Sequence, residues 1–185
     1  MHSDKRNKKT YQAINELVTT LSKEKSTIYG DIFRSVYLPI SAFENFCSWS
    51  SESYTRNCLF ENEKFELILL CWEGSQGTAI HDHGGEECWV RVIQGEFKET
   101  IYKLDEAGEL QIVKSHLAKK GDISYMIDFM GCHRLENQSD GRSMSLHLYA
   151  KPIRHCNLFD ESCGKFIHKD LFYNTTSKII TNSED

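Results

Sequence analysis

Long hydrophobic runs are missing from this sequence of 185 residues, and so is an excess of basic charge. The longest apolar run covers residues 67–72, whereas a helix that crosses a bilayer needs roughly 20 apolar residues. The 22 basic residues are outnumbered by 27 acidic ones, which gives a net charge of −5. Because phosphate binding needs a basic surface, we expect no nucleic-acid partner, and we expect no membrane insertion.

Cysteine pairs at metal-binding or redox spacing are also missing. The seven cysteines form no CxxC motif and their number is odd, which disfavours a cysteine zinc ribbon and a disulfide framework. The first ten residues, MHSDKRNKKT, are too polar for a secretory signal. Together these features predict a cytoplasmic protein with reduced thiols.

The apolar material that is present suits one hydrophobic core. The length favours a single domain on a prior of ~150 residues per domain, and a hydrophobic fraction of 39% is enough to bury a core. We expect the domain to span residues 10–174, between a disordered tail at 1–9 and a polar tail at 175–185. Its helical part is expected over 10–50 and its strands over about 55–160.

The local patterns support this division. Apolar residues from Ile14 to Leu21 repeat at helical spacing, and Ser41 with Glu44 matches a capping box, which predicts a second helix from Ser41. After residue 55, short β-rich segments are separated by turn residues, and such a series predicts a mainly β sandwich or small barrel. The predicted strands are 65–72, 88–94, 97–103, 110–114, 123–127, 133–137 and 143–149.

Two histidines lie two residues apart, at His81 and His83. On extended backbone, such residues point to the same side, so both imidazoles can reach one metal ion. An isolated HxH pair often arises by chance in a surface loop. A third histidine, His133, opens a later predicted strand; taken alone, it could equally be a buried, hydrogen-bonded side chain.

The surroundings of these histidines resemble the two motifs of the cupin superfamily. The first cupin motif continues from HxH to a glutamate and then a glycine, and Cys88 and Gly95 stand at those positions here. In the second motif, His133 and Asn137 keep the H-x-x-x-N spacing. Since Cys88 replaces the carboxylate, a set of three histidines would leave coordination positions open, as catalysis requires.

Four segments together resemble one cupin family, the cysteine dioxygenases. The resemblance implies a mainly β, jelly-roll-like cupin barrel with N-terminal α-helices, and a mononuclear Fe(II). It also implies a monomer that oxidises L-cysteine with O2 to cysteine sulfinic acid, with both oxygen atoms incorporated, in cysteine catabolism toward taurine. The four segments are YTRN at 54–57, CW through HDH at 71–83, GCHRLEN at 131–137 and SLHLY at 145–149.

Within this resemblance, His81, His83 and His133 are the expected Fe(II) ligands. Arg56 is the expected clamp for the substrate carboxylate, because a guanidinium can hold a carboxylate with two parallel hydrogen bonds. Related dioxygenases that prefer 3-mercaptopropionate lack this arginine, which favours cysteine as the substrate. Tyr54 is expected to assist Arg56. A surface salt bridge is the alternative interpretation of Arg56.

The remaining expected site residues come from three predicted strands. Ser145, His147 and Tyr149 alternate along one strand and therefore share a face, which suits a relay from serine through imidazole to phenol near the iron. Cys88 and Tyr149 match a pair that forms a thioether crosslink in some family members. Trp72 is expected to line the pocket wall or to pack in the core.

One departure from the family pattern follows the last of these residues. The family commonly continues with Ser-Pro-Pro and a cis-proline bond, whereas this chain has Ala150, Lys151 and Pro152. Because a cis bond before a residue other than proline is costly, we expect a trans bond and a differently set loop after Tyr149.

Three other functions fit parts of the pattern. A dioxygenase for 3-mercaptopropionate or cysteamine would use the same metal site with another thiol. A metal-binding cupin that acts as a sensor or sugar-binding module would need the histidines but not Arg56, His147 and Tyr149. A purely structural or interaction domain would require the histidine spacing to be accidental.

Overall fold

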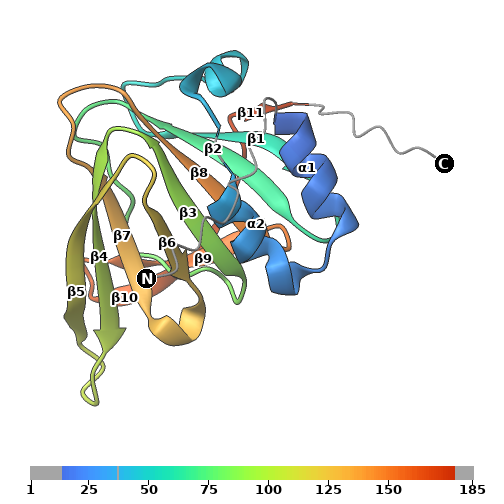
Figure 1. Cartoon of the computed structure of the whole chain (residues 1–185). Helices are drawn as coiled ribbons and strands as arrows, with labels where there is room; N and C mark the ends of the chain where they lie inside the picture. The colour runs from blue at the N-terminus through green and yellow to red at the C-terminus, as the bar shows by residue number, and fades with distance from the viewer. Residues whose placement is uncertain (1–13, 37, 178–185) are drawn as a thin grey trace, which may run out of the picture.

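The computed structural model describes residues 14–36 and 38–177, and strands make up most of it (Figure 1). Within these ranges no helix is long and apolar enough to cross a membrane. The helices are α1 (Ile14–Lys23) and α2 (Tyr29–Ser35), with 3-10 turns at Ser26–Ile28, Ile40–Phe46 and Asp128–Met130. The strands are β1 (Thr55–Glu61), β2 (Glu66–Trp72), β3 (Glu87–Gln94), β4 (Glu96–Leu104), β5 (Leu110–Lys119), β6 (Ile123–Met126), β7 (Cys132–Asn137), β8 (Ser143–Ala150), β9 (His155–Asp160), β10 (Lys165–Asp170) and β11 (Thr175–Thr176).

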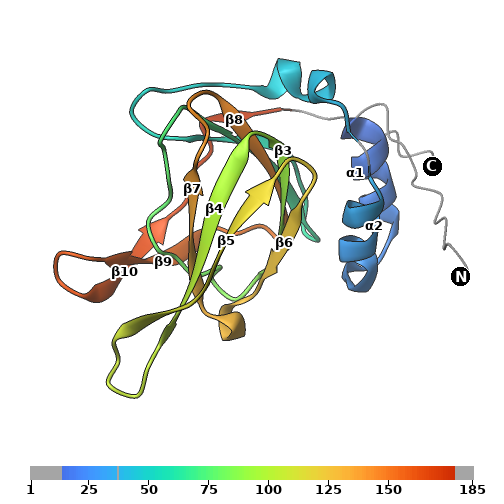
Figure 2. The ribbon, with the colours of Figure 1, turned by 60° about the vertical axis from the view of Figure 1, so that its left-hand side comes forward.

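The strands form two sheets and a separate hairpin. The larger sheet has the order β11-β1-β2-β8-β3-β6, the smaller one the order β5-β4-β7, and β9 pairs with β10. Figure 2 shows α1 and α2 on one side of the larger sheet and β4, β5 and β7 on its other side. The cupin-type fold class is confirmed, although the sheets do not close into a continuous barrel.

The larger sheet is buried on both faces, and this explains the continuous apolar run in β2. Leu67 and Leu69 belong to the core shared with the helices, whereas Ile68, Leu70 and Trp72 belong to a second core between the sheets. Successive strand residues point to opposite faces, so a strand between two cores needs apolar residues at nearly every position. We call the face of the larger sheet toward the smaller sheet its inner face. A polar residue on this face needs a partner or a function.

Each of the seven predicted strands is present, at close to the predicted bounds, with the strand predicted at 110–114 extending to Lys119. The prediction missed β1, β9, β10 and β11. The hairpin of β9 and β10 carries mostly polar, half-exposed or exposed residues, so it lacks the alternation of apolar and polar residues by which strands are predicted.

Two predictions about the chain outside the sheets need correction. The helix predicted from Ser41 is a 3-10 helix that begins at Ile40, with Pro39 at the N-cap and no side-chain cap. The polar tail expected at 175–185 begins as β11, because Asn57 pairs in parallel with Thr175. The tail expected at 1–9 and residues 178–185 lie outside the described residues.

Candidate active site

The three predicted metal ligands converge between the two sheets. One ring nitrogen from each of His81, His83 and His133 lies within 4.8 Å of the other two. His133 is on β7, and His81 pairs with it across an isolated bridge, with hydrogen bonds of 2.9 Å in both directions. The HxH segment is thereby fixed against β7, and the two sequence motifs meet.

The hydrogen bonds of these rings leave nitrogens free for a metal. His133 Nδ1 lies 2.7 Å from Glu99 Oε1, and His81 Nδ1 lies 3.0 Å from the carbonyl oxygen of Ala79. His83 is only 1% exposed, yet neither of its ring nitrogens has a hydrogen-bond partner among the described residues. Buried polar atoms without partners are rare, so these residues fit a bound cation.

Burial keeps the imidazoles of His81 and His83 neutral, as metal ligation requires. Burial, followed by the nearby His133, lowers the pKa of His81 to about 3. The same two causes, with His81 added, lower the pKa of His83 well below its usual range. Both rings therefore present lone pairs at neutral pH.

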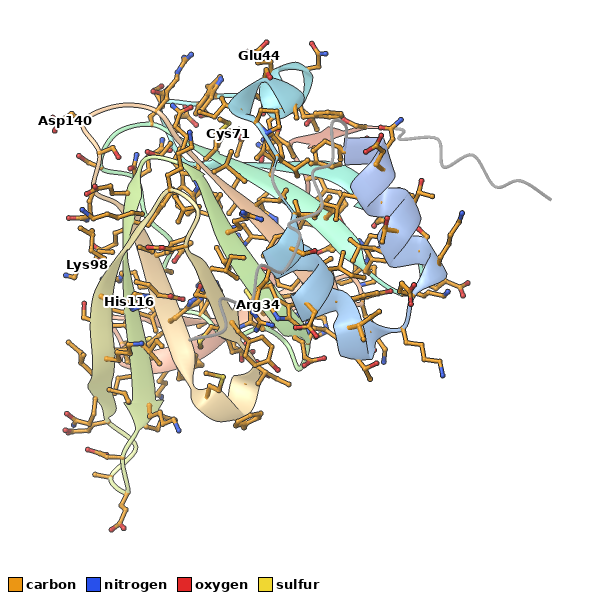
Figure 3. All side chains as sticks on the ribbon, in the orientation of Figure 1. Arg34, Glu44, Cys71, Lys98, His116 and Asp140 are labelled. Carbon is orange, nitrogen blue, oxygen red and sulfur yellow. The ribbon has the colours of Figure 1, made fainter. Side chains whose placement is uncertain are left out.

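Glu99 supports the site from β4 and was missed by the sequence analysis. Its carboxylate is buried and contacts both His133 and His116, whose Nε2 lies 3.4 Å from Glu99 Oε2. His116 lies on β5, where Figure 3 labels it. Burial opposes ionisation, but the hydrogen bond with His133 and the electrostatic influence of His133 and His116 outweigh it and lower the pKa of Glu99. A metal-binding histidine held by a carboxylate has a fixed orientation. Glu99 lies two residues after Phe97 on the same strand, so it shares the face of Phe97, which packs in the core between the sheets. This spacing is the signal in the sequence that could have identified Glu99.

A cavity of about 110 Å³ adjoins the histidines, and Arg56 lines it. Arg56 comes from β1, next to the strand that carries the core residue Leu70. Its Nε and Nη2 atoms are buried and lack hydrogen-bond partners within the described ranges. Burial alone would lower the pKa of Arg56, but Tyr149 and Glu66 outweigh it and raise the pKa. The guanidinium is charged, and its free donors suit an anionic ligand.

Tyr54 lines the same cavity, whereas Trp72 does not. The two rings stack, with centroids 4.5 Å apart at 28°, and Trp72 is fully buried in the core between the sheets. Of the two predicted places for Trp72, the core is the one observed. Trp72 supports the cavity wall from behind Tyr54.

Part of the predicted relay on β8 is formed. Trp72 Nε1 donates to Ser145 Oγ at 3.0 Å, and Ser145 Oγ lies 2.8 Å from His147 Nε2. His147 and Tyr149 both line the cavity, and their rings are nearly parallel at 6.4 Å between centroids. Burial, followed by Arg56, lowers the pKa of His147 well below its usual range. The imidazole is neutral and stacked beside the phenol.

Cys88 and Tyr149 are direct partners across β3 and β8. Both side chains are buried. Burial, followed by Cys88, raises the pKa of Tyr149 well above its usual range. Both groups are protonated at neutral pH, and the strand pairing places them opposite each other.

The turn after Tyr149 has the trans peptide bonds expected from the missing proline at position 151. The described residues contain no cis peptide bond, and Lys151 has a positive φ of 90°. Its backbone N–H donates to the carbonyl oxygen of Lys64 at 2.9 Å. The turn is thus held by a backbone hydrogen bond that a proline at position 151 could not donate.

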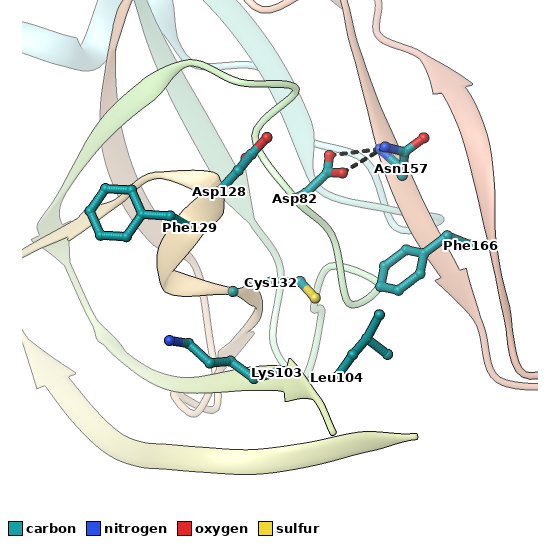
Figure 4. A pocket seen from close by; sticks show the side chains of 9 residues that line it. Asp82, Lys103, Leu104, Asp128, Phe129, Cys132, Asn157 and Phe166 are labelled. Atoms are coloured by element: carbon teal, nitrogen blue, oxygen red, sulfur yellow. Dashed lines mark hydrogen bonds between the residues drawn. The ribbon is translucent and has the colours of Figure 1, made fainter. Parts of the chain in front are cut away.

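A larger groove of about 460 Å³ is lined by residues adjacent in sequence to the histidines, among them Asp82 and Cys132 (Figure 4). Asp82, between the two histidines of the HxH motif, accepts two hydrogen bonds from Asn157 at 2.6 and 2.8 Å. Asp128 accepts hydrogen bonds from the backbone N–H groups of His83 and Gly85 at 2.9 and 2.6 Å. Through these hydrogen bonds, the carboxylates of Asp82 and Asp128 hold the HxH segment in place.

Comparison with known proteins agrees with this geometry. The family model of cysteine dioxygenase type I matches residues 31–162. The chain is 36% identical to cysteine dioxygenase type 1 of Homo sapiens over 115 residues, which are 60% of this chain and 58% of that protein. It is 35% identical to cysteine dioxygenase type 1 of Danio rerio over 124 residues, 64% of this chain and 62% of that protein.

The matches therefore span about three-fifths of the curated relatives. Among solved structures, a double-stranded β-helix protein from Klebsiella pneumoniae has a TM-score of 0.50 at 15% identity and covers 69% of this chain and 86% of that chain. This likeness supports the fold alone.

Proposed function

Because the chain belongs to the cysteine dioxygenase type I family, we propose that it is an Fe(II)-dependent dioxygenase that oxidises L-cysteine with O2 to cysteine sulfinic acid. One observation carries the proposal: the converging histidines His81 and His133 line the same small cavity as Arg56, whose buried donors have no partner among the described residues. A thiol ligand for a metal and a carboxylate ligand for an arginine would meet in that cavity.

The reaction needs no reductant beyond the substrate. The thiol sulfur gives up four electrons, O2 accepts them, and both oxygen atoms end on sulfur. When bound, Fe(II) would favour the thiolate and mediate electron flow to O2, which has a spin barrier to direct attack. His81, His83 and His133 would hold the ion as neutral ligands, so its positive charge stays available to the thiolate.

Arg56 would orient the substrate through its carboxylate. Two parallel hydrogen bonds fix both the position and the direction of a carboxylate, and Tyr54 beside it narrows the space. A substrate held in this way presents its thiol and amine to the histidine side of the cavity, and such positioning lowers the barrier by removing freedom of movement beforehand.

Tyr149 would act as a neutral hydrogen-bond donor toward the reacting sulfur and oxygen atoms. Its hydroxyl stays protonated because its pKa is raised. The indole of Trp72 can only donate, so Ser145 accepts from it and has its own proton to donate to His147. This series of contacts would hold the imidazole against the phenol ring.

We also propose that Cys88 and Tyr149 form a thioether crosslink during turnover. The bond joins Sγ to a ring carbon, the S–H and C–H bonds break, and O2 accepts the two electrons and two protons. The link would fix the phenol and lower the entropy cost of positioning it. Intact mass should fall by about two hydrogens per chain, and the Cys88→Ser variant should lose the shift. An unchanged mass after many turnovers would refute the crosslink.

Substrate choice separates the proposal from its neighbours. Protein loaded with Fe(II) under anaerobic conditions is exposed to O2 with L-cysteine, 3-mercaptopropionate or cysteamine in parallel, and the products are identified by mass spectrometry. Sulfinate mainly from L-cysteine, with a roughly 30-fold or larger loss in Arg56→Gln, is the expected result, because truncating one partner of a buried charge pair costs ~2–5 kcal/mol.

Sulfinate mainly from another thiol would keep the metal site and reassign the substrate. No oxygenated product from any thiol, despite bound iron, would favour a metal-binding cupin without turnover. A cytoplasmic location, a monomeric state and a role in cysteine catabolism toward taurine stay predictions.

A further inference from the structure

The backbone of Arg56 is hydrogen-bonded to the segment of residues 169–174, which precedes β11. Arg56 lies on β1, which is next to the edge strand β11 of the larger sheet (Figure 1). The backbone N–H of Arg56 donates to Asn174 Oδ1 at 2.8 Å, and the backbone N–H of Asn174 donates to the carbonyl oxygen of Arg56 at 2.8 Å. One residue therefore satisfies both outward-facing backbone groups of Arg56.

The same segment forms part of the cavity. Leu171 and Lys169 line it together with Arg56, and the backbone N–H of Leu171 donates to the carbonyl oxygen of Arg154 at 2.9 Å. The segment 169–174 thus contacts the space occupied by the substrate and the backbone of the residue proposed to bind it. It lies beyond residues 31–162, which the family model matches.

Tyr173 ties the segment to a buried carboxylate behind Arg56. Its hydroxyl contacts Glu66 and lies 3.0 Å from Glu61 Oε2, and it accepts a hydrogen bond from Arg154 Nη1 at 2.8 Å. Glu66 is fully buried at the start of β2 and acts electrostatically on Arg56. The segment therefore acts on Arg56 in two ways: Asn174 bonds to its backbone, and Tyr173 bonds to Glu66, whose charge acts on the guanidinium.

We propose that Asn174 is a positioning residue that sets the preference for carboxylate-bearing thiols by fixing the backbone of Arg56. The inference rests on the proposed function, since it assumes that Arg56 binds the substrate carboxylate. Two parallel hydrogen bonds to a carboxylate tolerate only small displacements of the guanidinium. Loosening β1 at Arg56 weakens that grip and leaves the thiol and amine contacts at the histidines unchanged.

The test compares two ligands that differ in the carboxylate. The Fe(II)-loaded full chain binds L-cysteine or cysteamine without O2, and calorimetry gives both dissociation constants. Asn174→Ala removes the Oδ1 acceptor, and we expect L-cysteine to bind about three- to tenfold more weakly while cysteamine changes less than twofold. Asn174→Asp keeps an acceptor oxygen and should restore binding. Aerobic assays should show the loss mainly in KM for L-cysteine.

A matched control lies one residue further along the chain. Thr175 Oγ1 donates to Asn57 Oδ1 at 2.8 Å, so Thr175→Val loses a hydrogen bond of the adjoining strand β11 that does not involve Arg56. It should leave the ratio of the two dissociation constants unchanged. Asn174 is exposed, so its variants should fold.

Equal weakening of both ligands by Asn174→Ala, or the same change in Thr175→Val, would overturn the inference and reduce Asn174 to a structural role. Unchanged binding of L-cysteine in Asn174→Ala would overturn it as well. Failure of the proposed function looks different: the unaltered protein would form no sulfinate from L-cysteine, whatever residue stands at position 174.

Discussion

The two faces of the larger sheet use the same strands for different purposes. On β8, Leu146 and Leu148 face the helices and belong to an apolar core. The alternate residues Ser145, His147 and Tyr149 face the space between the sheets, where two of them line the cavity. Every residue of β8 is buried, so the two faces differ in chemistry and not in exposure.

This difference separates stability from function along a single strand. The helix-facing side chains gain free energy by leaving water, whereas the inner polar groups cost free energy unless each has a partner. Ser145, His147 and Glu99 have partners. The ring nitrogens of His83 and two guanidinium nitrogens of Arg56 have no hydrogen-bond partner among the described residues. These are the atoms that a metal and a carboxylate would satisfy.

The largest expected effect comes from removing a ligand on the inner face. His83→Ala should lose more than 100-fold in iron affinity and in activity, because even residues that only support metal ligands contribute 10–100-fold. Iron content by elemental analysis and turnover of L-cysteine provide the measurements. Iron retained at one ion per folded chain would contradict the assignment of the three histidines.

A substitution on the helix-facing side should do the reverse. Leu148→Ala leaves a cavity beneath α1 and α2 and should cost ~2–5 kcal/mol of unfolding free energy, measured by urea denaturation. Iron content per folded chain should not change. If Leu148→Ala instead released iron without loss of stability, the division between the two faces would be wrong.

Glu99 connects the inner face to the smaller sheet, and its substitution should have a medium effect. Glu99→Gln keeps the shape but removes the charge beside His133, and iron affinity should fall about 10–100-fold. The matched control is Glu136→Gln on β7, which breaks only a surface pair with Lys98 at 3.8 Å, worth ~0–1 kcal/mol. Equal effects of the two substitutions would contradict the role of Glu99.

The smallest expected effect is a pH dependence of the metal-free protein. Burial lowers the folded pKa of His147 and His83, so each stabilises the fold above the unfolded pKa of about 6.5, and this contribution is lost as pH falls below it. Each should cost ~1.4 kcal/mol per pH unit below 6.5. Urea denaturation at successive pH values gives the unfolding free energy as a function of pH. Below pH 6.5 this free energy should fall less steeply with decreasing pH in His147→Gln than in the unaltered protein. An equal dependence on pH would contradict a neutral, buried His147.

The parts of the fold that the sequence predicted are those with a local pattern. Short β-rich segments between turn residues predicted β3, β4 and β8, and the HxH spacing together with the resemblance to the cupin motifs predicted that His133 joins His81 and His83. The contacts that the prediction missed depend on residues distant in sequence: Glu99 meets His133 across a strand pair, and Asn174 meets Arg56 across 118 positions. Neither pairing leaves a periodic trace in the sequence.

Other differences arise where tertiary structure overrides a local motif. The capping-box pattern at Ser41 and Glu44 matched a helix start, but a 3-10 helix begins one residue earlier, at Ile40, with Pro39 as its N-cap. The pairing of His147 with Ser145 was predicted from alternation on one strand, whereas the stacking of Trp72 behind Tyr54 depends on how β2 meets the segment before β1.

The most direct test of the central claim is the fate of isotopically labelled O2 during turnover of L-cysteine by the iron-loaded protein. If the histidines and Arg56 form one dioxygenase site, mass spectrometry will find cysteine sulfinic acid with both oxygen atoms derived from O2. Sulfinate with only one labelled oxygen atom, or cystine as the sole oxidation product, would contradict the account.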